Sequence, residues 1–232
     1  MNKQNTSDKT APVGRRPRGG TDSVSRERLL DTAIDLFAER GIANTTVAQI
    51  GAAGKVTSAM VHYWFDTRDK LLDAVVEERV APLMGRIWSP ADPERSTALE
   101  LVQGLLSRIL EVTEDATWLP SLWLREIIQE GGLLRERVHA RIPRDRNAAF
   151  WQSIAEAQKR GEINADISPE LLFVTLLGLV MLPLAAITSR HRVYPGSTID
   201  RKQFERHITA MLLHGLTGAA NLGGASSRKA EQ

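Results

Sequence analysis

Residues 45–72 read TTVAQIGAAGKVTSAMVHYWFDTRDKLL, and this stretch predicts two short helices joined by a tight turn, with a third helix directly after them. The first helix is indicated by a Thr45-Thr46 pair suited to N-capping and by apolar residues at helical spacing, namely Val47, Ile50 and Ala53. The Gly54-Lys55 pair then interrupts the apolar pattern. The order helix, turn, helix therefore follows from the local sequence.

The second short helix carries an unusual set of polar side chains. Its capping pair is Thr57-Ser58, and its apolar residues Val61 and Phe65 lie on one face. The remaining side chains point largely away from that face: Thr57, Ser58, Met60, His62 and Tyr63. A short helix that presents hydroxyls, an imidazole and a phenol suits the major groove of DNA. The same spacing also fits an ordinary three-helix packing unit with no role in nucleic-acid binding.

The match extends beyond these helices. Upstream, RERLLDTAIDLFAERG (26–41) has an apolar stripe at helical spacing and a C-capping Gly41, the stripe being Leu30, Ala33, Ile34 and Phe37. Together with HYWF (62–65) and DTRDKLL (66–72), this segment resembles the DNA-binding domain of the TetR/AcrR family of bacterial transcription regulators. Lys55 departs from the family pattern, which usually has Gly there, and costs some free energy if that position is left-handed.

The resemblance implies which residues contact DNA. The recognition helix and its neighbours supply Thr46, Thr57, Ser58, Met60, His62 and Tyr63, and Arg68 is expected to hold a phosphate at the start of the fourth helix. Residues 1–22 form a basic arm, predicted to be disordered, that contains Arg15, Arg16 and Arg18. This arm is either a solvated tail or a segment that lies along phosphates or enters the minor groove.

Charge and composition agree with DNA binding. The chain has 232 residues and a formal net charge of +2, whereas residues 1–28 hold seven basic and three acidic residues, a net charge of +4. Basic charge is therefore concentrated at the end that carries the predicted DNA reader. There are no cysteines, which excludes a disulfide framework and thiolate chemistry, and the N-terminus has no apolar run of a signal peptide. We expect a soluble cytoplasmic protein.

One apolar stretch needs separate consideration as a membrane span. LLFVTLLGLVMLPLAAI (171–187) is 17 residues long and contains Pro183. It falls short of the roughly 20 residues that cross a bilayer, so we expect a buried helix and no membrane association.

The whole chain is predicted to be all-α, with about nine helices. After the reader, the helical patterns cover 66–88 with a bend at Pro82, 96–114, 117–130, 133–160 with an interruption at Pro143, 169–191, and 200–220. The predicted organisation is an arm at 1–22, a helix-turn-helix domain at 23–83, a ligand-binding and dimerisation domain at 84–222, and a tail at 223–232.

The C-terminal domain is rich in large rings. The family resemblance implies that it binds a small effector, and aromatic side chains on adjacent helices either interlock as core or line an apolar cavity. The candidate ligand-binding residues are Trp118, Trp123, Arg125, Trp151, Phe173 and His191, with a lipophilic or aromatic effector favoured. Arg125 and its neighbour Glu126 have two interpretations, either polar anchors for the ligand or ion pairs at a surface or interface.

The same domain is expected to dimerise and to lack catalytic chemistry. In the family, the last two helices form a four-helix dimer interface, for which the candidates are Leu176, Leu179, Leu212 and Leu216. His207 and His214 are seven residues apart, unlike the usual spacing of four for zinc ligands on one helix, so no metal and no cofactor are predicted.

The sequence therefore predicts a homodimeric, ligand-responsive repressor of double-stranded operator DNA. Its ligand favours a dimer geometry in which the recognition helices are wrongly spaced for the operator, so that the affinity for DNA falls. The helix predicted over 66–88 connects the two domains. Two alternatives stay open, a helical small-molecule sensor that has lost DNA binding and an all-α enzyme.

Overall fold

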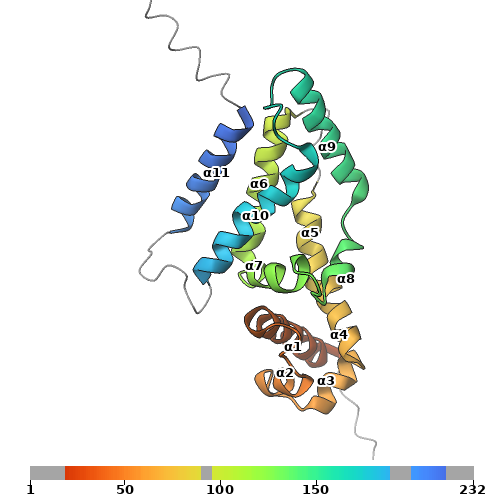
Figure 1. Ribbon diagram of the computed structural model, residues 1–232. Helices are drawn as coiled ribbons and strands as arrows, with labels where there is room; N and C mark the ends of the chain where they lie inside the picture. Colours follow the sequence, from red (N-terminus) through yellow and green to blue (C-terminus); the bar gives the residue numbers. More distant parts are fainter. Residues whose placement is uncertain (1–18, 90–95, 189–199, 218–232) are drawn as a thin grey trace, which may run out of the picture.

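The computed structural model describes residues 19–89, 96–188 and 200–217, and this part of the chain is helical with no strand. Its helices form two lobes, a small one at the bottom of Figure 1 and a larger bundle above it. The predicted all-α fold is confirmed.

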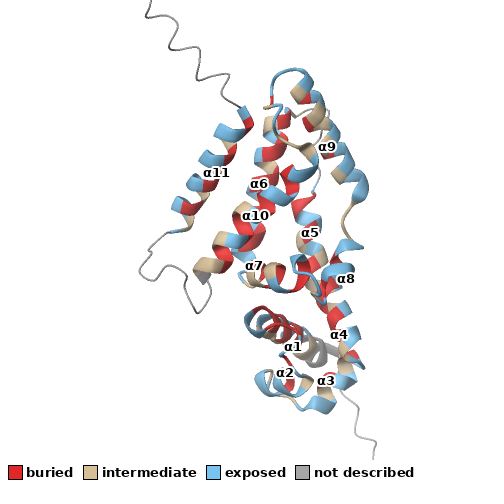
Figure 2. Cartoon of the chain, in the orientation of Figure 1, coloured by how far each residue is buried: buried red, intermediate tan, exposed pale blue. Residues whose placement is uncertain are grey.

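The small lobe is built from α1 (Gly19–Arg40), α2 (Val47–Ala53) and α3 (Ser58–Phe65). The predicted apolar stripe of α1 is buried, as are Ile50, Val61 and Phe65 from the two short helices. Gly41 ends α1 with a φ of 83° and donates its N–H to the Phe37 carbonyl at 2.9 Å, as its C-capping position predicts. The polar sides of α2 and α3 stay exposed (Figure 2).

A continuous helical run links the two lobes. It consists of α4 (Arg68–Val75), the π-helical segment η1 (Val76–Val80) and α5 (Ala81–Ile87). Pro82 lies at the N-terminal end of α5, and the π-helical segment directly before it accommodates the missing N–H. The predicted domain boundary at residue 83 falls inside α5, so the lobes share this rod.

The upper bundle contains the remaining helices: α6 (Ala98–Asp115), α7 (Leu119–Leu122), η2 (Trp123–Ile128), α8 (Arg135–His139), α9 (Arg144–Lys159), α10 (Pro169–Thr188) and α11 (Arg201–Thr217). α10 packs against α6, α7 and α9, and α11 lies alongside α6 (Figure 1). The pattern predicted over 133–160 is two helices, α8 and α9, separated at Pro143 where the interruption was expected.

α10 is longer than the apolar stretch on which its prediction rested. Its 20 residues, with a mean hydropathy of 2.3 over Pro169–Ile187, make it the one helix in the described ranges that could cross a membrane by length and composition. The chain nevertheless packs its own helices around it, and Leu172, Leu176 and Val180 are buried among them. Length alone therefore does not separate a core helix from a span.

Candidate nucleic-acid interface and effector region

The ends of α2 and α3 are held by threonine caps. Thr46 forms a capping box with Gln49, in which its hydroxyl accepts from the Gln49 N–H at 3.2 Å and its own N–H donates to the Gln49 side chain at 2.8 Å. Thr57 accepts from the Met60 N–H at 3.3 Å. Both threonines are exposed, and their structural role at the helix ends is fixed by these bonds.

The turn between the two helices explains the unusual lysine. A Cβ on Gly54 would lie 2.6 Å from Leu29 Cδ1, so glycine at this position allows α1 to approach the turn closely. Lys55 then takes the left-handed conformation with a φ of 57°, the case in which lysine costs more free energy than the Gly that is usual there. Its side chain is exposed, which places a positive charge at the edge of the reading surface.

The structure gives α3 the two faces that the sequence predicts. Val61 and Phe65 are buried, whereas Ser58, His62 and Tyr63 are exposed, Tyr63 to 74%. Met60 is half-buried, so only part of its side chain is available to a base. His62 Nδ1 lies 2.9 Å from the carbonyl oxygen of Asp66, the residue that caps the C-terminal end of α3. The structure leaves the Tyr63 phenol solvated on a short capped helix, and its contact with DNA bases stays a prediction.

Arg68 lies differently from its predicted role. One guanidinium nitrogen, Nη2, donates to the carbonyl of Ile42, just beyond the end of α1, and the side chain is half-buried. In this conformation Arg68 fastens α4 to α1. Its contact with phosphate stays a prediction, and the expected contacts of Arg15, Arg16 and Arg18 fall outside the described residues.

A second cation near the reading helix is also paired. Lys70 donates to Asp66 at 2.7 Å, one helical turn away, and both side chains are exposed. The Lys70 ammonium holds the pKa of the Asp66 carboxyl below its ordinary value through this hydrogen bond and its charge. Because the pair is fully solvated, little free energy opposes its exchange for a phosphate contact.

The predicted effector residues differ in how far the chain buries them. Trp123 and Phe173 are buried, Trp118 and Trp151 are half-buried, and Arg125 is exposed. Arg125 therefore does not line an internal site, and His191 lies outside the described residues. A hollow of about 280 Å³ lies among α6, α7, α10 and α11, where Thr117, Pro120, Leu184 and Phe204 contribute to its wall.

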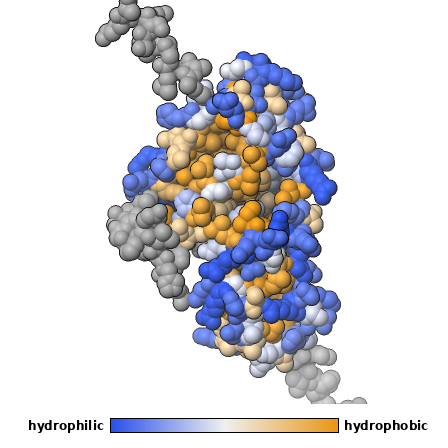
Figure 3. All heavy atoms as spheres, in the orientation of Figure 1, coloured by the Kyte–Doolittle hydropathy of each residue, from blue (hydrophilic) through white to orange (hydrophobic). Residues whose placement is uncertain are grey.

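The predicted interface leucines need a similar correction. Leu176, Leu212 and Leu216 are buried within the single chain, and Leu179 is half-buried. A residue already covered by its own chain has no surface to offer a partner. The exposed apolar residues of these two helices are Leu171, Val174, Leu182 and Met211, and Figure 3 shows apolar surface over α10.

Glu126 joins the two lobes, a role that the sequence did not predict. It is 6% exposed, in η2 of the upper bundle, yet its Oε1 accepts the Ile42 N–H of the lower lobe at 2.8 Å. Its Oε2 accepts the Leu133 N–H at 3.2 Å. Neither of the two interpretations of this carboxylate, ligand anchor or ion pair, is what the structure shows, because its partners are backbone amides.

Ion pairs support the same junction between the lobes. Arg137 of α8 donates to Asp73 at 2.7 Å and to Asp69 at 3.0 Å, both on α4. Arg141 pairs with Glu77 of η1. Among the residues that the structure describes, no group of three or more His, Asp and Glu side chains lies close enough to hold a metal ion.

Comparison with known proteins fits this architecture. The family model described as bacterial regulatory proteins, tetR family, matches residues 29–75, from α1 to the end of α4. The HTH-type transcriptional repressor KstR2 of Rhodococcus jostii is 36% identical over 207 residues, covering 86% of this chain and 94% of the repressor. The chain belongs to the TetR family. The resemblance drawn from residues 26–72 is thereby confirmed.

Other TetR-family proteins match less of the chain or only its fold. The regulator BetI of Brucella melitensis biotype 2 is 30% identical over 108 residues, so the match spans about half of that relative, 54%. The structure of the ketosteroid regulator KstR2 of Mycobacterium tuberculosis aligns with a TM-score of 0.64 and 21% identity over 83% of this chain and 95% of that one. AibR, solved with isovaleryl coenzyme A and operator DNA, aligns with a TM-score of 0.60 and 20% identity over 81% and 97%.

Proposed function

We propose that this TetR-family chain is a cytoplasmic repressor that releases its operator when a small lipophilic or aromatic molecule binds the upper bundle. Support comes from the name of its 36%-identical relative, a transcriptional repressor, and from AibR, which was crystallised with both an acyl coenzyme A and DNA. In this proposal, α3 reads bases, the basic arm contacts the DNA backbone, and the chain has no catalytic role.

The observation that carries the proposal is the hydrogen bond from Ile42 to Glu126. A buried carboxylate is stable only when its oxygens are hydrogen-bonded, and here one oxygen binds the lower lobe and the other binds the upper lobe. Any shift of η2 therefore pulls on the segment between α1 and α2. Because Trp123 belongs to η2, a molecule that moves this ring also moves Glu126.

The same segment is held from its other side. The Ile42 carbonyl accepts from Arg68 at the start of α4, directly after the recognition helix α3. A chain of contacts therefore runs from Glu126 in the upper bundle through Ile42 to Arg68, which follows the recognition helix α3. Such a chain is a continuous path of contacts along which a change in the upper bundle can reach the recognition helix.

The proposal includes a homodimer. The exposed apolar residues Leu171, Val174 and Leu182 of α10, with Met211 of α11, are what a partner subunit would cover, and exposed apolar surface of this kind usually marks an interface. An interface of about 1,200–2,000 Å² through these helices would set two reading helices about 34–36 Å apart for adjacent half-sites. A monomer in light scattering at micromolar concentration would contradict this part.

Base reading is tested with Tyr63. A gel shift against the protein's own upstream DNA should show Tyr63→Ala weakening specific binding about tenfold, because a good base contact contributes about 1–3 kcal/mol. Tyr63→Phe is the matched control, since it keeps the ring and removes only the hydroxyl. Unchanged binding by Tyr63→Ala would remove α3 from the recognition surface.

Coupling is tested with Glu126. Glu126→Gln keeps the side-chain volume and removes the charge that holds Ile42, and should change the operator Kd by about fivefold or more. Glu130→Gln, an exposed neighbour, is the control. If both variants bound the operator like the parent, the Ile42–Glu126 bond would be a packing feature without a regulatory role.

A further inference from the structure

Three buried polar atoms of the upper bundle have no hydrogen-bond partner among the described residues. They are Trp88 Nε1, Asn147 Oδ1 and Trp151 Nε1, two donors and one acceptor. Leaving such an atom unpaired costs about 1–3 kcal/mol, and few native groups are left in that condition. Three in one part of the bundle indicate a partner that the chain itself does not supply.

The three side chains come from α9 and from the residue after α5, and contacts between these two segments bring them near one another. Asn147 and Trp151 are one turn apart on α9, so they share a face of that helix with Phe150. Trp88 follows the last residue of α5, and its ring centroid lies 6.3 Å from that of Phe150 at an interplanar angle of 83°. Arg146 Nη1 also donates to the Trp88 carbonyl at 2.5 Å, which fixes α9 against the end of α5.

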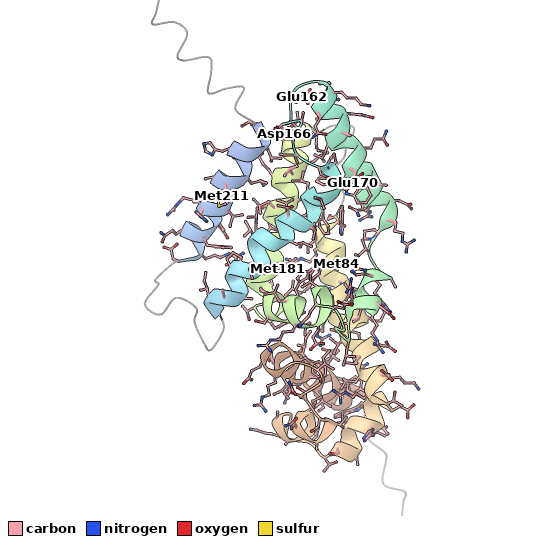
Figure 4. All side chains as sticks on the ribbon, in the orientation of Figure 1. Met84, Glu162, Asp166, Glu170, Met181 and Met211 are labelled. Atoms are coloured by element: carbon pink, nitrogen blue, oxygen red, sulfur yellow. The ribbon has the colours of Figure 1, made fainter. Side chains whose placement is uncertain are left out.

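The side chains described next to the Trp88 ring are apolar. The Phe173 ring of α10 lies 4.5 Å from that of Trp88, and Met84, one turn earlier on α5, is also buried. Figure 4 labels Met84 and Met181, which lie in the middle of the bundle on α5 and α10. Methionine side chains adapt to contents of different shape, whereas neither phenylalanine nor methionine can satisfy an indole N–H well.

We infer that Trp88, Asn147 and Trp151 are the polar anchor of the effector site, and that the effector is a largely apolar molecule with a neutral carbonyl or hydroxyl oxygen. This inference rests on the proposed function. Two indole N–H groups can donate to the lone pairs of one oxygen, and Asn147 Oδ1 can accept from a hydroxyl or N–H of the same molecule. All three anchor groups are uncharged, so a neutral ligand group suits them better than a buried ion.

The site is closed in this structure. The anchor atoms are buried and the rings of Trp88 and Phe173 pack together, so a ligand must displace side chains to reach them. Trp88 lies at the end of the run α4–η1–α5, whose other end follows the recognition helix. Displacing Trp88 therefore acts on the rod that carries the reader, which links this anchor to release of DNA.

Matched pairs of probes test the anchor on the full chain. The pairs are α-tetralone and tetralin, camphor and bornane, and cyclododecanone and cyclododecane, which differ only in the carbonyl. At least one ketone should bind about fivefold tighter than its hydrocarbon, and isotope-labelled indole N–H resonances of Trp88 and Trp151 should shift on binding. If none of the three ketones binds better than its partner, the inference is wrong.

Variants separate the anchor from general apolar binding. Trp88→Phe, Trp151→Phe and Asn147→Leu keep bulk and remove one polar atom each, so each indole variant should lower the preference for ketone about threefold or more. Trp64→Phe is the control, because Trp64 lies on α3 of the lower lobe and not in the upper bundle. An unchanged preference in both indole variants would overturn the inference, and would indicate buried water as the partner of these atoms.

The outcome is distinguishable from failure of the proposed function. Ketone binding without release of operator DNA would leave the anchor standing and reject ligand-released repression through it. Operator binding and release by another molecule, with no ketone preference, would reject the anchor and leave the repressor proposal intact.

Discussion

The two lobes of this protein differ in how completely they satisfy their own side chains. In the lower lobe, the described helices bury Phe37, Ile34 and Ile50 fully, and no buried side-chain polar atom there lacks a partner. In the upper lobe, Trp88, Asn147 and Trp151 each keep an unpartnered atom, and Leu171, Leu182 and Met211 are exposed. Among the described residues of the lower lobe, the large apolar side chain that is exposed is Tyr63, on the recognition helix α3.

This difference fits the partners that we propose for each lobe. A reader that presents polar and aromatic groups outward can keep a complete core, because DNA contacts its surface only. A lobe that takes a ligand into its interior and a second subunit onto its face must leave part of its polar and apolar groups unsatisfied when alone. We expect substitutions in the two lobes to report this contrast.

The largest effect on the free energy of unfolding is expected from removing one phenylalanine ring in each lobe. Phe37→Ala should lower the free energy of unfolding by about 3–5 kcal/mol, because its neighbours are fully packed and the cavity cannot collapse. Phe173→Ala should lower the free energy of unfolding by less. Water that fills the new cavity can hydrogen-bond to the unpaired N–H groups of Trp88 and Trp151. Urea unfolding at fixed protein concentration measures both, and equal losses would break the comparison.

The next largest effect on stability is expected at Gly132, a glycine at the junction between the two lobes. A Cβ on Gly132 would lie 2.4 Å from the carbonyl oxygen of Glu126, so Gly132→Ala must displace backbone beside the bond to Ile42. We expect a loss of about 1–3 kcal/mol and faster amide exchange at Ile42. Gly85→Ala, at a helical glycine with open space around it, should instead stabilise by about 0.5–1 kcal/mol. If both variants changed the free energy of unfolding in the same direction, close packing at the junction between the lobes would be contradicted.

A smaller gain is expected in the turn of the reader. Lys55→Gly relieves the left-handed conformation and should raise the free energy of unfolding by about 0.5–1 kcal/mol. It also removes a charge at the reading surface, so operator binding should weaken at low salt. Greater stability without loss of affinity would show that this lysine does not contact phosphate.

The smallest effect concerns acid stability of the connector. Arg26 donates both Nη atoms to Glu78 at 2.6 and 2.7 Å, and this hydrogen bonding holds the pKa of the Glu78 carboxyl below its ordinary value. A lowered carboxyl pKa stabilises the fold above the unfolded-state pKa, and the contribution disappears as pH falls through the folded-state pKa.

Glu78→Gln should therefore lose about 1 kcal/mol or less at neutral pH and show a shallower decline in stability on acidification. Equal acid profiles for the variant and the parent would exclude this pair from the pH response.

The reader was largely predictable because its signals are local. Caps at Thr46 and Thr57, the glycine at 41 and the buried spacing of Val61 and Phe65 each depend on a few neighbouring residues. The positive φ of Lys55 was left open by the sequence, which showed only that lysine stands where the family usually has Gly, and the structure settled it. Arg68 was assigned by family correspondence alone, and its contact with Ile42 spans 26 residues that no local pattern connects.

The sequence by itself determined the helices, the family and the end of the chain that reads DNA, because periodicity, capping and charge act over one or two helical turns. Only the tertiary structure decided that Leu176, Leu212 and Leu216 face inward, that Glu126 reaches across to Ile42, and which rings keep an unpartnered N–H. The physical reason is that α10 is apolar on nearly every side. Such a helix gives no signal of which face its neighbours cover, and contacts between distant segments depend on how helices dock.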